Sequence, residues 1–437
     1  MRSKPGEGIP VVAGLLTEPQ GSTEGHPGGG VGRPAPNNSG VGRPAPNRSP
    51  APNNSWPGWR GPNRDGHVPW LPETLPDQAK FLWRKKLFNQ GLGGIAATEK
   101  YVVVVDRDLA DATDIFHCFA ADTGDEIWIV RQIAPGRLDY GNSPRATPLI
   151  WENLVFLYGA FGHFHCVELA TGKVVWQSDL RSQFGVTDKL VWGMACSPLI
   201  VGGKLILSPG GKEASLVAVE PRTGKVIWKS PGNPAAFASI VVGSFGGKQQ
   251  IIGYDNISLG GWDIATGKRL WTLVPEVAKD FNVPTPIVWG DKLVVATENN
   301  GTRIYGFDAE GNIKPQPLAE YFDLAPDTHT PVIAGDRLFG VWSRLYCLSL
   351  SNGLKPLWTA QDEAFFDYAT ILATDERLLI TSQAGELLLI DAKADQFKIL
   401  SRLKLFEDEN GVYSHPALVG ERLYVRSSGE VVCLPLK

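Results

Sequence analysis

The sequence predicts an all-β protein, an eight-bladed β-propeller of four-stranded blades, from a repeated turn and a count of inner strands. In the repeated turn, a Thr-Gly step ends one strand and a Trp stands four residues after the Gly in the next. The pairs are Gly124 and Trp128, Gly172 and Trp176, Gly224 and Trp228, and Gly267 and Trp271. Degenerate copies at Gly311 and Gly353 continue a spacing of 42 to 52 residues, a period typical of propeller blades.

Each repeated residue has a structural explanation. Gly supplies the positive φ angle of a tight turn, and the Thr before it favours turns. The Trp is large enough to cover the gap between neighbouring blades. We therefore interpret the Gly–Trp repeat as architecture rather than as a binding site.

Eight short apolar segments are predicted to form the inner strands of the blades. They span residues 94–97, 146–150, 196–200, 238–241, 285–288, 330–333, 369–372 and 415–419. The eighth repeat reaches Lys437 after only three strands, while residues 81–87 form a spare outer strand that carries Trp83. We expect this N-terminal strand to complete the eighth blade and close the ring, which leaves no open sheet edge.

Composition divides the chain into three parts. Residues 1–55 are rich in Pro, Gly, Asn and Ser and are predicted to be a disordered tail. Residues 56–80 are predicted to be an irregular strap packed on the propeller, which occupies residues 81–437. In the tail, the apolar run 9–16 is short and broken, so it is no clear signal peptide; a misplaced start would explain the tail equally well.

Charge and hydropathy exclude several classes of protein. The net charge is −4, which gives no indication of binding to nucleic acid. No apolar run approaches the ~18 residues of a transmembrane segment. We expect a monomer.

Charged groups outside the repeat receive structural interpretations. Arg60 and Arg64, in the strap, are expected to pair with carboxylates and hold the strap in place, with anion binding as the alternative. Four acidic residues in one loop of the first blade are expected to form a solvated loop without calcium; they are Asp106, Asp108, Asp111 and Asp114.

Four of the five cysteines share one position in the repeat. Cys118, Cys166 and Cys347 each stand six residues before the turn Gly, and Cys433 occupies the same place in the last blade. Ala218 and Gly261 take this place in two other blades, so the position requires a small residue. We expect buried, unbridged cysteines. The chain has no adjacent pair of cysteines.

The loops that enter the inner strands converge on one mouth of the channel and carry the candidate site. The aromatic, amide and charged side chains there are Arg137, Tyr140, Asn142, Arg145, Trp192, His329, Asp367, Tyr368, Tyr413 and His415. They form either a recognition surface or a polar plug of the channel. Metal binding by His329 and His415 is not expected, because zinc requires three or four converging ligands.

The repeated Thr-Gly turn with its Trp, together with closure by an N-terminal strand, resembles the PQQ-like β-propeller repeat proteins over residues 80–437. One branch of that family, the quinoprotein dehydrogenases, holds pyrroloquinoline quinone (PQQ) and calcium against a vicinal cysteine pair, which is lacking here. Another branch is a scaffold lipoprotein of outer-membrane assembly. The resemblance implies the periplasm or cell envelope.

Three hypotheses about function follow. The first is a non-enzymatic binding or scaffold propeller without a cofactor, which recognises a protein, peptide or glycan at the channel mouth. The second is a divergent oxidoreductase that uses PQQ with calcium. The third is a hydrolase or lyase in which His415 or His329 forms an acid–base pair with Asp367. The absence of a catalytic constellation favours the first hypothesis.

Overall fold

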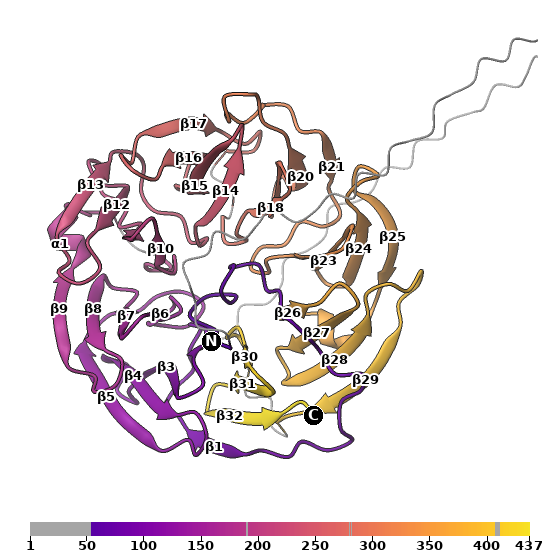
Figure 1. The fold of residues 1–437 in the computed structure, drawn as a ribbon, viewed down its shortest axis with the longest axis horizontal. Helices are drawn as coiled ribbons and strands as arrows, with labels where there is room; N and C mark the ends of the chain where they lie inside the picture. The colour runs from indigo at the N-terminus through magenta and orange to yellow at the C-terminus, as the bar shows by residue number, and fades with distance from the viewer. Residues whose placement is uncertain (1–53, 189–190, 279, 281, 407–410) are drawn as a thin grey trace, which may run out of the picture. The chain divides into compact units, whose positions relative to one another are not determined.

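The computed structural model describes residues 54–437 except 189–190, 279, 281 and 407–410, so most of the predicted disordered tail lies outside the described residues. The described strands form eight four-stranded antiparallel sheets arranged in a ring, which confirms the eight-bladed β-propeller (Figure 1). In each blade the first strand lies nearest the channel and the fourth lies at the rim.

The first four blades follow the chain from one repeat to the next. Blade 1 contains β2 (Ala96–Ala97), β3 (Tyr101–Arg107), β4 (Thr113–Ala120) and β5 (Glu126–Ile133). Blade 2 contains β6 (Leu149–Trp151), β7 (Leu154–Tyr158), β8 (His163–Glu168) and β9 (Val174–Asp179). Blade 3 contains β10 (Leu199–Val201), β11 (Lys204–Leu207), β12 (Leu216–Val219) and β13 (Val226–Ser230). Blade 4 contains β14 (Val241–Phe245), β15 (Lys248–Tyr254), β16 (Leu259–Asp263) and β17 (Arg269–Leu273).

The remaining blades complete the circle. Blade 5 contains β18 (Ile287–Trp289), β19 (Lys292–Thr297), β20 (Gly301–Tyr305) and β21 (Ala319–Tyr321). Blade 6 contains β22 (Val332–Ala334), β23 (Arg337–Val341), β24 (Leu345–Ser349) and β25 (Lys355–Ala360). Blade 7 contains β26 (Ala369–Ala373), β27 (Arg377–Ser382), β28 (Glu386–Asp391) and β29 (Ile399–Lys404). Blade 8 contains β30 (Ala417–Val419), β31 (Arg422–Arg426), β32 (Glu430–Pro435) and β1 (Trp83–Lys86).

The N-terminal strand β1 closes the ring as predicted. It pairs antiparallel with β32, and Trp83 lies opposite Cys433. The same register recurs wherever the repeat carries its Trp, and the opposed pairs are Trp128 and Cys118, Trp176 and Cys166, Trp228 and Ala218, Trp271 and Gly261, and Trp358 and Cys347. A small residue is needed in the third strand because an indole ring covers it.

All five cysteines are buried and free of disulfide bonds, which confirms that prediction. Burial raises the pKa of the Cys118 and Cys433 thiols to about 12. The thiols therefore remain protonated at neutral pH and act as small apolar groups.

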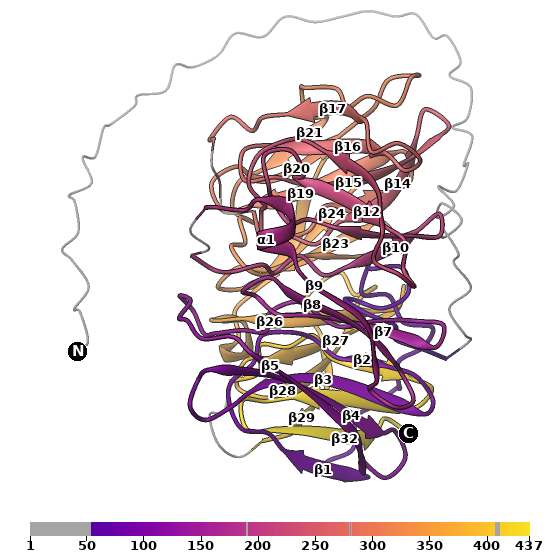
Figure 2. The ribbon, with the colours of Figure 1, turned by 90° about the vertical axis from the view of Figure 1, so that its left-hand side faces the viewer.

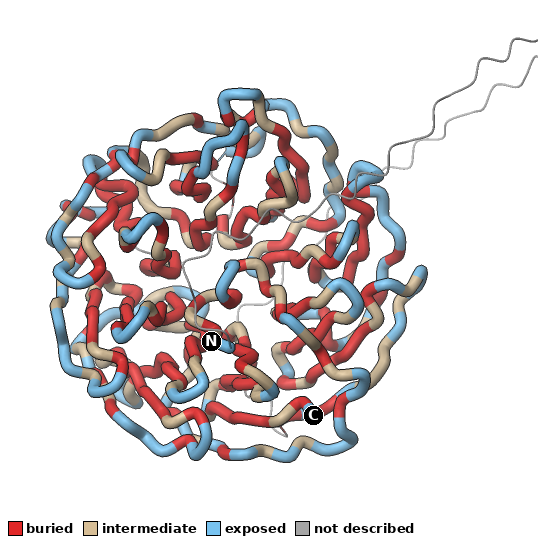
Figure 3. The backbone as a smooth tube through the Cα atoms, in the orientation of Figure 1, coloured by how far each residue is buried: buried red, intermediate tan, exposed pale blue. Residues whose placement is uncertain are grey.

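The outer Trp also joins one blade to the next. The indole N–H of Trp128 donates to the carbonyl of Leu169 at 2.8 Å, and that of Trp176 donates to Pro221 at 2.8 Å. The ring is held by buried apolar faces between blades, with exposed residues concentrated on the outer strands (Figure 3). Blade 5 departs from the pattern, because β21 has three residues and no Trp.

Two short helices lie in the loops that follow outer strands. Helix α1 (Leu180–Phe184) begins after Asp179, whose side chain accepts hydrogen bonds from two backbone N–H groups. It lies at the rim beside blade 2 (Figure 2). The 3₁₀ helix η1 (Glu363–Phe365) precedes β26. Within the described part of the chain, no helix is long and apolar enough to span a membrane.

Candidate functional site

The strap before β1 crosses the propeller from one side of the ring to the other (Figure 1). Trp56 exchanges backbone hydrogen bonds with Ala97 of blade 1, and Val68 donates its N–H to Ala373 of blade 7. Further along, the indole of Trp70 donates to the carbonyl of Gly420 in blade 8. Segments far apart in sequence are thereby connected across the channel.

Two strap arginines are buried in the channel. Arg60 donates to the carbonyl of Pro331 in blade 6, and Arg64 donates to the carbonyls of Ser197 and Pro198 in blade 3, all at 2.8–3.0 Å. The predicted pairing with carboxylates is wrong, because neither guanidinium has an ion-pair partner among the described residues. Main-chain carbonyls compensate each charge in part, and burial lowers the pKa of both arginines to about 10.

A ring of hydroxyl groups lines the inner strands where they start. In blades 1 to 5, the backbone N–H of the residue at this position donates to the side-chain hydroxyl of the equivalent residue in the next blade, at 3.0–3.2 Å. The bonds run from Gly94 to Thr147, from Thr147 to Ser197, from Ser197 to Ser239, from Ser239 to Thr285, and from Thr285 to Thr330. These bonds satisfy N–H groups that no sheet ladder reaches. Blade 1 needs Gly94 there, since a Cβ would lie 2.6 Å from the Thr147 hydroxyl.

The series of hydrogen-bonded hydroxyl groups ends at blade 6, and two histidines lie nearby in blades 6 and 8. His329 precedes Thr330, and its Nδ1 donates to the carbonyl of Ala369 at 2.8 Å. In blade 8, His415 occupies the position that a hydroxyl residue takes in blades 2 to 6. Its imidazole contacts the indole of Trp59 edge-on, with the centroids of the two aromatic rings 5.7 Å apart. Burial and the nearby Arg60 charge lower the pKa of His329 to about 3, and the same causes lower that of His415 well below its usual value.

The loops at the mouth bring together three aromatic side chains from successive blade junctions. Tyr140 lies 6.4 Å from Trp192, and Trp192 lies 4.8 Å from Phe237, measured between ring centroids. Tyr140 is 82% exposed and holds a left-handed backbone with φ of +56°. We call Tyr140, Trp192 and Phe237 the aromatic arc.

A second aromatic pair stands at the junctions around blade 7. The rings of Tyr368 and Tyr413 are 6.0 Å apart, and Gln383 donates its side-chain amide to the Tyr413 hydroxyl. Burial raises the pKa of Tyr368, while the Arg60 charge opposes this shift. Tyr368 therefore lies near the buried cation of the strap.

The other predicted site residues have different environments. Arg145 donates to the carbonyls of Asp139 and Gly141, the latter at 2.7 Å, so it stabilises its own loop. Arg137 and Asp367 are exposed. None of these three side chains is held against the buried histidines by a described contact.

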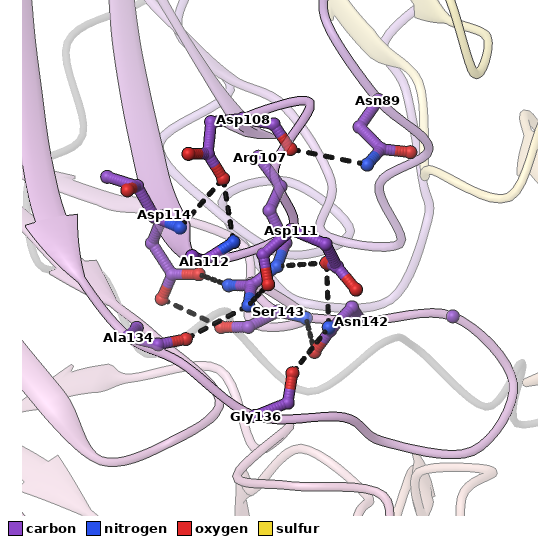
Figure 4. A network of polar contacts seen from close by, with 12 residues as sticks. Asn89, Arg107, Asp108, Asp111, Ala112, Asp114, Ala134, Gly136, Asn142 and Ser143 are labelled. Carbon is purple, nitrogen blue, oxygen red and sulfur yellow. Dashed lines mark hydrogen bonds and ion pairs between the residues drawn. The ribbon is translucent and has the colours of Figure 1, made fainter.

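Asn142 belongs to a buried polar network around Arg107 (Figure 4). The guanidinium of Arg107 binds Asp111 at 2.5 Å and Asp114 at 2.6 Å, and it donates to the carbonyl of Ala134 at 2.9 Å. Asn142 donates to Asp111 at 2.8 Å. The network joins the β3–β4 turn of blade 1 to the loop that enters blade 2.

The predicted solvated acidic loop is therefore wrong for its buried members. Asp106 and Asp114 have no exposed surface. Burial raises the pKa of Asp114 to about 6 even though Ser143 and Arg107 both donate to it. All four aspartates accept hydrogen bonds from neighbouring groups of the protein, although Asp108 and Asp111 remain partly exposed. The sequence concealed this because Arg107 lies among them as an ordinary strand residue.

A groove at the rim was not anticipated from the sequence. It lies at the rim between blades 5 and 6, has a volume of about 770 Å³, and includes Tyr321, Phe322, Trp342, Tyr346 and Trp358 in its lining. It opens where the short strand β21 lacks the repeated Trp. The missing Trp was the only sequence signal for this groove.

The residues do not fit PQQ with calcium. Among the described residues, no group of three His, Cys, Asp or Glu side chains could hold a metal ion. The channel interior presents Arg60 and Arg64, whose positive charges would repel a calcium ion. Asp106 and Asp114 are engaged by arginines.

Fold and site together define a β-propeller with a strap-filled channel and an aromatic rim at its mouth. Residues 111–360 match the PQQ_2 family model, described as outer membrane protein assembly factor BamB. Because this match covers more than half of the chain, the protein belongs to that family.

Solved structures share the fold at low sequence identity. The structure of BamB from Moraxella catarrhalis is 14% identical, with a TM-score of 0.55, over 82% of this chain and 99% of that chain. The quinohemoprotein alcohol dehydrogenase ADHIIG from Pseudomonas putida HK5 is 12% identical, with a TM-score of 0.62, over 88% of this chain and 80% of that chain. These likenesses show the fold alone.

One curated relative matches part of the chain. The quinoprotein alcohol dehydrogenase PedH of Pseudomonas putida KT2440 is 26% identical over an alignment of 135 residues, and the match covers 20% of this chain. The match spans 23% of the length of PedH.

Proposed function

We propose that the protein is a non-enzymatic binding propeller that holds a protein, peptide or glycan partner at the channel mouth. The aromatic arc carries this proposal. Tyr140 is 82% exposed although it is an aromatic residue beside Trp192 and Phe237. Exposed aromatic clusters supply most of the binding energy in many recognition surfaces.

The geometry of the arc suits recognition. Its three side chains come from the loops that enter blades 2, 3 and 4, so they follow one side of the mouth. Tyr and Trp provide large contact area with few rotatable bonds, which lowers the entropy lost on binding. The Arg107 network supports the first of these loops through Asn142.

The channel histidines are poorly suited to acid–base catalysis. A catalyst works best when its pKa lies near the operating pH. The pKa of His329 is about 3, and that of His415 is also far below neutral, so neither donates a proton at neutral pH. Asp367, the partner of these histidines in the hydrolase hypothesis, is exposed.

Family membership supports a binding role. The family description names an outer membrane protein assembly factor. A protein or peptide partner is the form of the proposal that this description favours, and the cell envelope is the compartment it favours.

Photo-crosslinking in cells tests the proposal. A photoreactive amino acid replaces Tyr140 in one full-length variant and Phe322, in the rim groove, in another. We expect one discrete partner to be linked at position 140 and none at position 322. The partner is then purified, and its affinity is measured for a Tyr140→Ala/Trp192→Ala variant.

The double variant should bind at least about tenfold more weakly, as loss of aromatic anchors usually does. The control variant Phe322→Ala removes an aromatic side chain that is 60% exposed in the rim groove, and should bind as the native chain does. Crosslinks confined to position 322, or equal affinities for the native chain and the double variant, would contradict a partner at the mouth.

A further inference from the structure

The hydroxyl ring of the channel is interrupted on one side. From blade 2 to blade 6 each ring hydroxyl accepts a hydrogen bond from the preceding blade. At blade 7 the equivalent residue is Thr370, which is 1% exposed, and its hydroxyl has no partner in the described chain. The ring therefore leaves an unused hydrogen-bonding group in the channel wall.

Two histidines beside this break also present unused nitrogen atoms. His329 is 5% exposed, and its Nε2 is buried without a described partner. In blade 8, the buried Nδ1 of His415 likewise lacks one. An unused buried polar atom costs about 1–3 kcal/mol, so each of these three favours a ligand that would satisfy it.

The tautomer of His329 follows from its environment. Its Nδ1 lies 2.8 Å from the carbonyl oxygen of Ala369, which can only accept, so Nδ1 carries the hydrogen. The ring is neutral at physiological pH, because its pKa is about 3. Nε2 is therefore a lone-pair acceptor that requires a donor from a ligand.

The buried positive charge of Arg60 requires a hydrogen-bond acceptor from a ligand, whereas His329 requires a donor. Arg60 is 2% exposed, lies close enough to His329 and His415 to lower the pKa of each, and has no ion-pair partner among the described residues. Its Nε also has no described partner. A buried guanidinium without a carboxylate is costly, and an anion with acceptor oxygens would compensate it.

Partly exposed aromatic residues connect this region with solvent. Trp59, Tyr368 and His415 are all half-buried. The Arg60 guanidinium lies 5.4 Å from the centroid of the Trp59 ring and interacts electrostatically with Tyr368. Trp59 and Tyr368 therefore lie beside Arg60 and would contact a ligand held by its guanidinium.

We propose that the channel binds a small hydroxycarboxylate at blades 6 to 8. Its carboxylate accepts from Arg60, and its hydroxyl donates to Nε2 of His329. The Thr370 hydroxyl supplies a further hydrogen bond. This site is separate from the aromatic arc, and it does not depend on the proposed partner.

Calorimetric titration of the full-length chain tests the proposal with a matched pair of ligands. L-lactate and propionate have the same carbon skeleton and charge, and they differ by one hydroxyl group. We expect lactate to bind at one equivalent and at least about tenfold more tightly than propionate, because a site built for a hydroxyl rejects an analogue without it. Equal binding of the two, or no saturation by either, would overturn the proposal.

Two variants locate the binding site. Thr370→Val keeps the side-chain shape and removes the unused hydroxyl, and Arg60→Gln removes the charge. Both should weaken lactate binding by about tenfold or more. The control Thr285→Val makes the same change in blade 5, where the hydroxyl already accepts from Ser239, and should leave the affinity unchanged.

Two further results would count against a hydroxycarboxylate. If inorganic phosphate binds more tightly than lactate and Thr370→Val weakens it, the site is a phosphate site instead. If Thr370→Val binds lactate as the native chain does, the ligand lies elsewhere. Thermal unfolding of each variant establishes that it is folded, and Thr370→Val alone decides the question if Arg60→Gln does not fold.

Discussion

Trp83 of β1 packs directly over Gly124 of blade 1. A Cβ built on Gly124 would lie 2.6 Å from Cδ2 of Trp83, and the backbone of Gly124 has a φ of +70°. The same contact joins Trp128 to Gly172 and Trp176 to Gly224. The repeated Gly and the repeated Trp thus form one packing contact across each of these blade junctions. The Trp of one blade covers the turn of the next.

Substituting this glycine should destabilise the propeller strongly. Gly124→Ala combines backbone strain with a clash against a buried indole, so we expect a loss of about 2–4 kcal/mol in the free energy of unfolding. Gly353→Ala is the matched control: it has a φ of +66°, but its Cβ would meet only Ala319 at 3.8 Å. Strain alone should cost about 1 kcal/mol there. Urea unfolding measures both, and equal losses would refute the packing explanation.

The cysteines should be unreactive while the protein is folded. Burial raises the pKa of Cys118, Cys166, Cys347 and Cys433 to about 12 and that of Cys196 to about 11. Only the thiolate attacks thiol reagents, so a chromogenic disulfide at pH 8 should label none of the five within minutes. All five should react after denaturation. Rapid labelling of even one thiol in the native protein would show that a blade core opens.

Stability should depend on the protonation of His329. Its pKa is lowered from 6.5 to about 3 on folding, so the unfolded chain binds the proton more tightly. The stability from its neutral form is complete above pH 6.5 and is lost progressively as the pH falls toward 3. Between pH 6.5 and 5, this group should lower the free energy of unfolding by about 2 kcal/mol.

A His329→Gln variant isolates this effect from other titrating groups. Asp114 has a raised pKa and contributes in the opposite direction, but it contributes equally to both proteins. The difference in unfolding free energy between native and variant chains should therefore shrink as the pH falls from 6.5 to 5. A constant difference would mean that His329 is protonated normally in the folded protein.

Breaking the buried network around Arg107 should be costly. Arg107→Met leaves the carboxylate of Asp114 buried without its cation, and we expect a loss of about 3–5 kcal/mol. The double variant Arg107→Met/Asp114→Asn removes both charges and should recover part of this loss. Thermal or urea unfolding compares the native chain, Arg107→Met, Asp114→Asn and the double variant. A double variant destabilised by as much as the sum of the two single changes, or by more, would contradict the ion-pair explanation.

Much of the architecture was predictable from the chain because it is encoded locally. A turn glycine, a strand of alternating residues and a Trp at fixed spacing describe one blade, and repetition describes the ring. The position of Cys433 in the repeat predicted a small buried residue there, and the structure places it opposite Trp83 of the closing strand. Membership of the PQQ-like family followed from the same repeat.

The candidate site was less predictable, because it depends on contacts between distant residues. Sequence reasoning identified His329, Tyr368 and His415, and singled out Arg60 separately, but did not place Arg60 near them. Arg60 reaches the carbonyl of Pro331, 271 residues away. No local pattern in the strap indicates which carbonyl it will meet.

The sequence by itself therefore determined the number of blades, the small residues under each Trp and the closing strand, since each follows from periodic local patterns. Only the tertiary structure decided the path of the strap, the break in the hydroxyl ring at Thr370 and the burial of Asp106 and Asp114. The physical reason is that a strand pattern specifies which side chains are apolar, while polar partners in a channel are fixed by where separate blades converge.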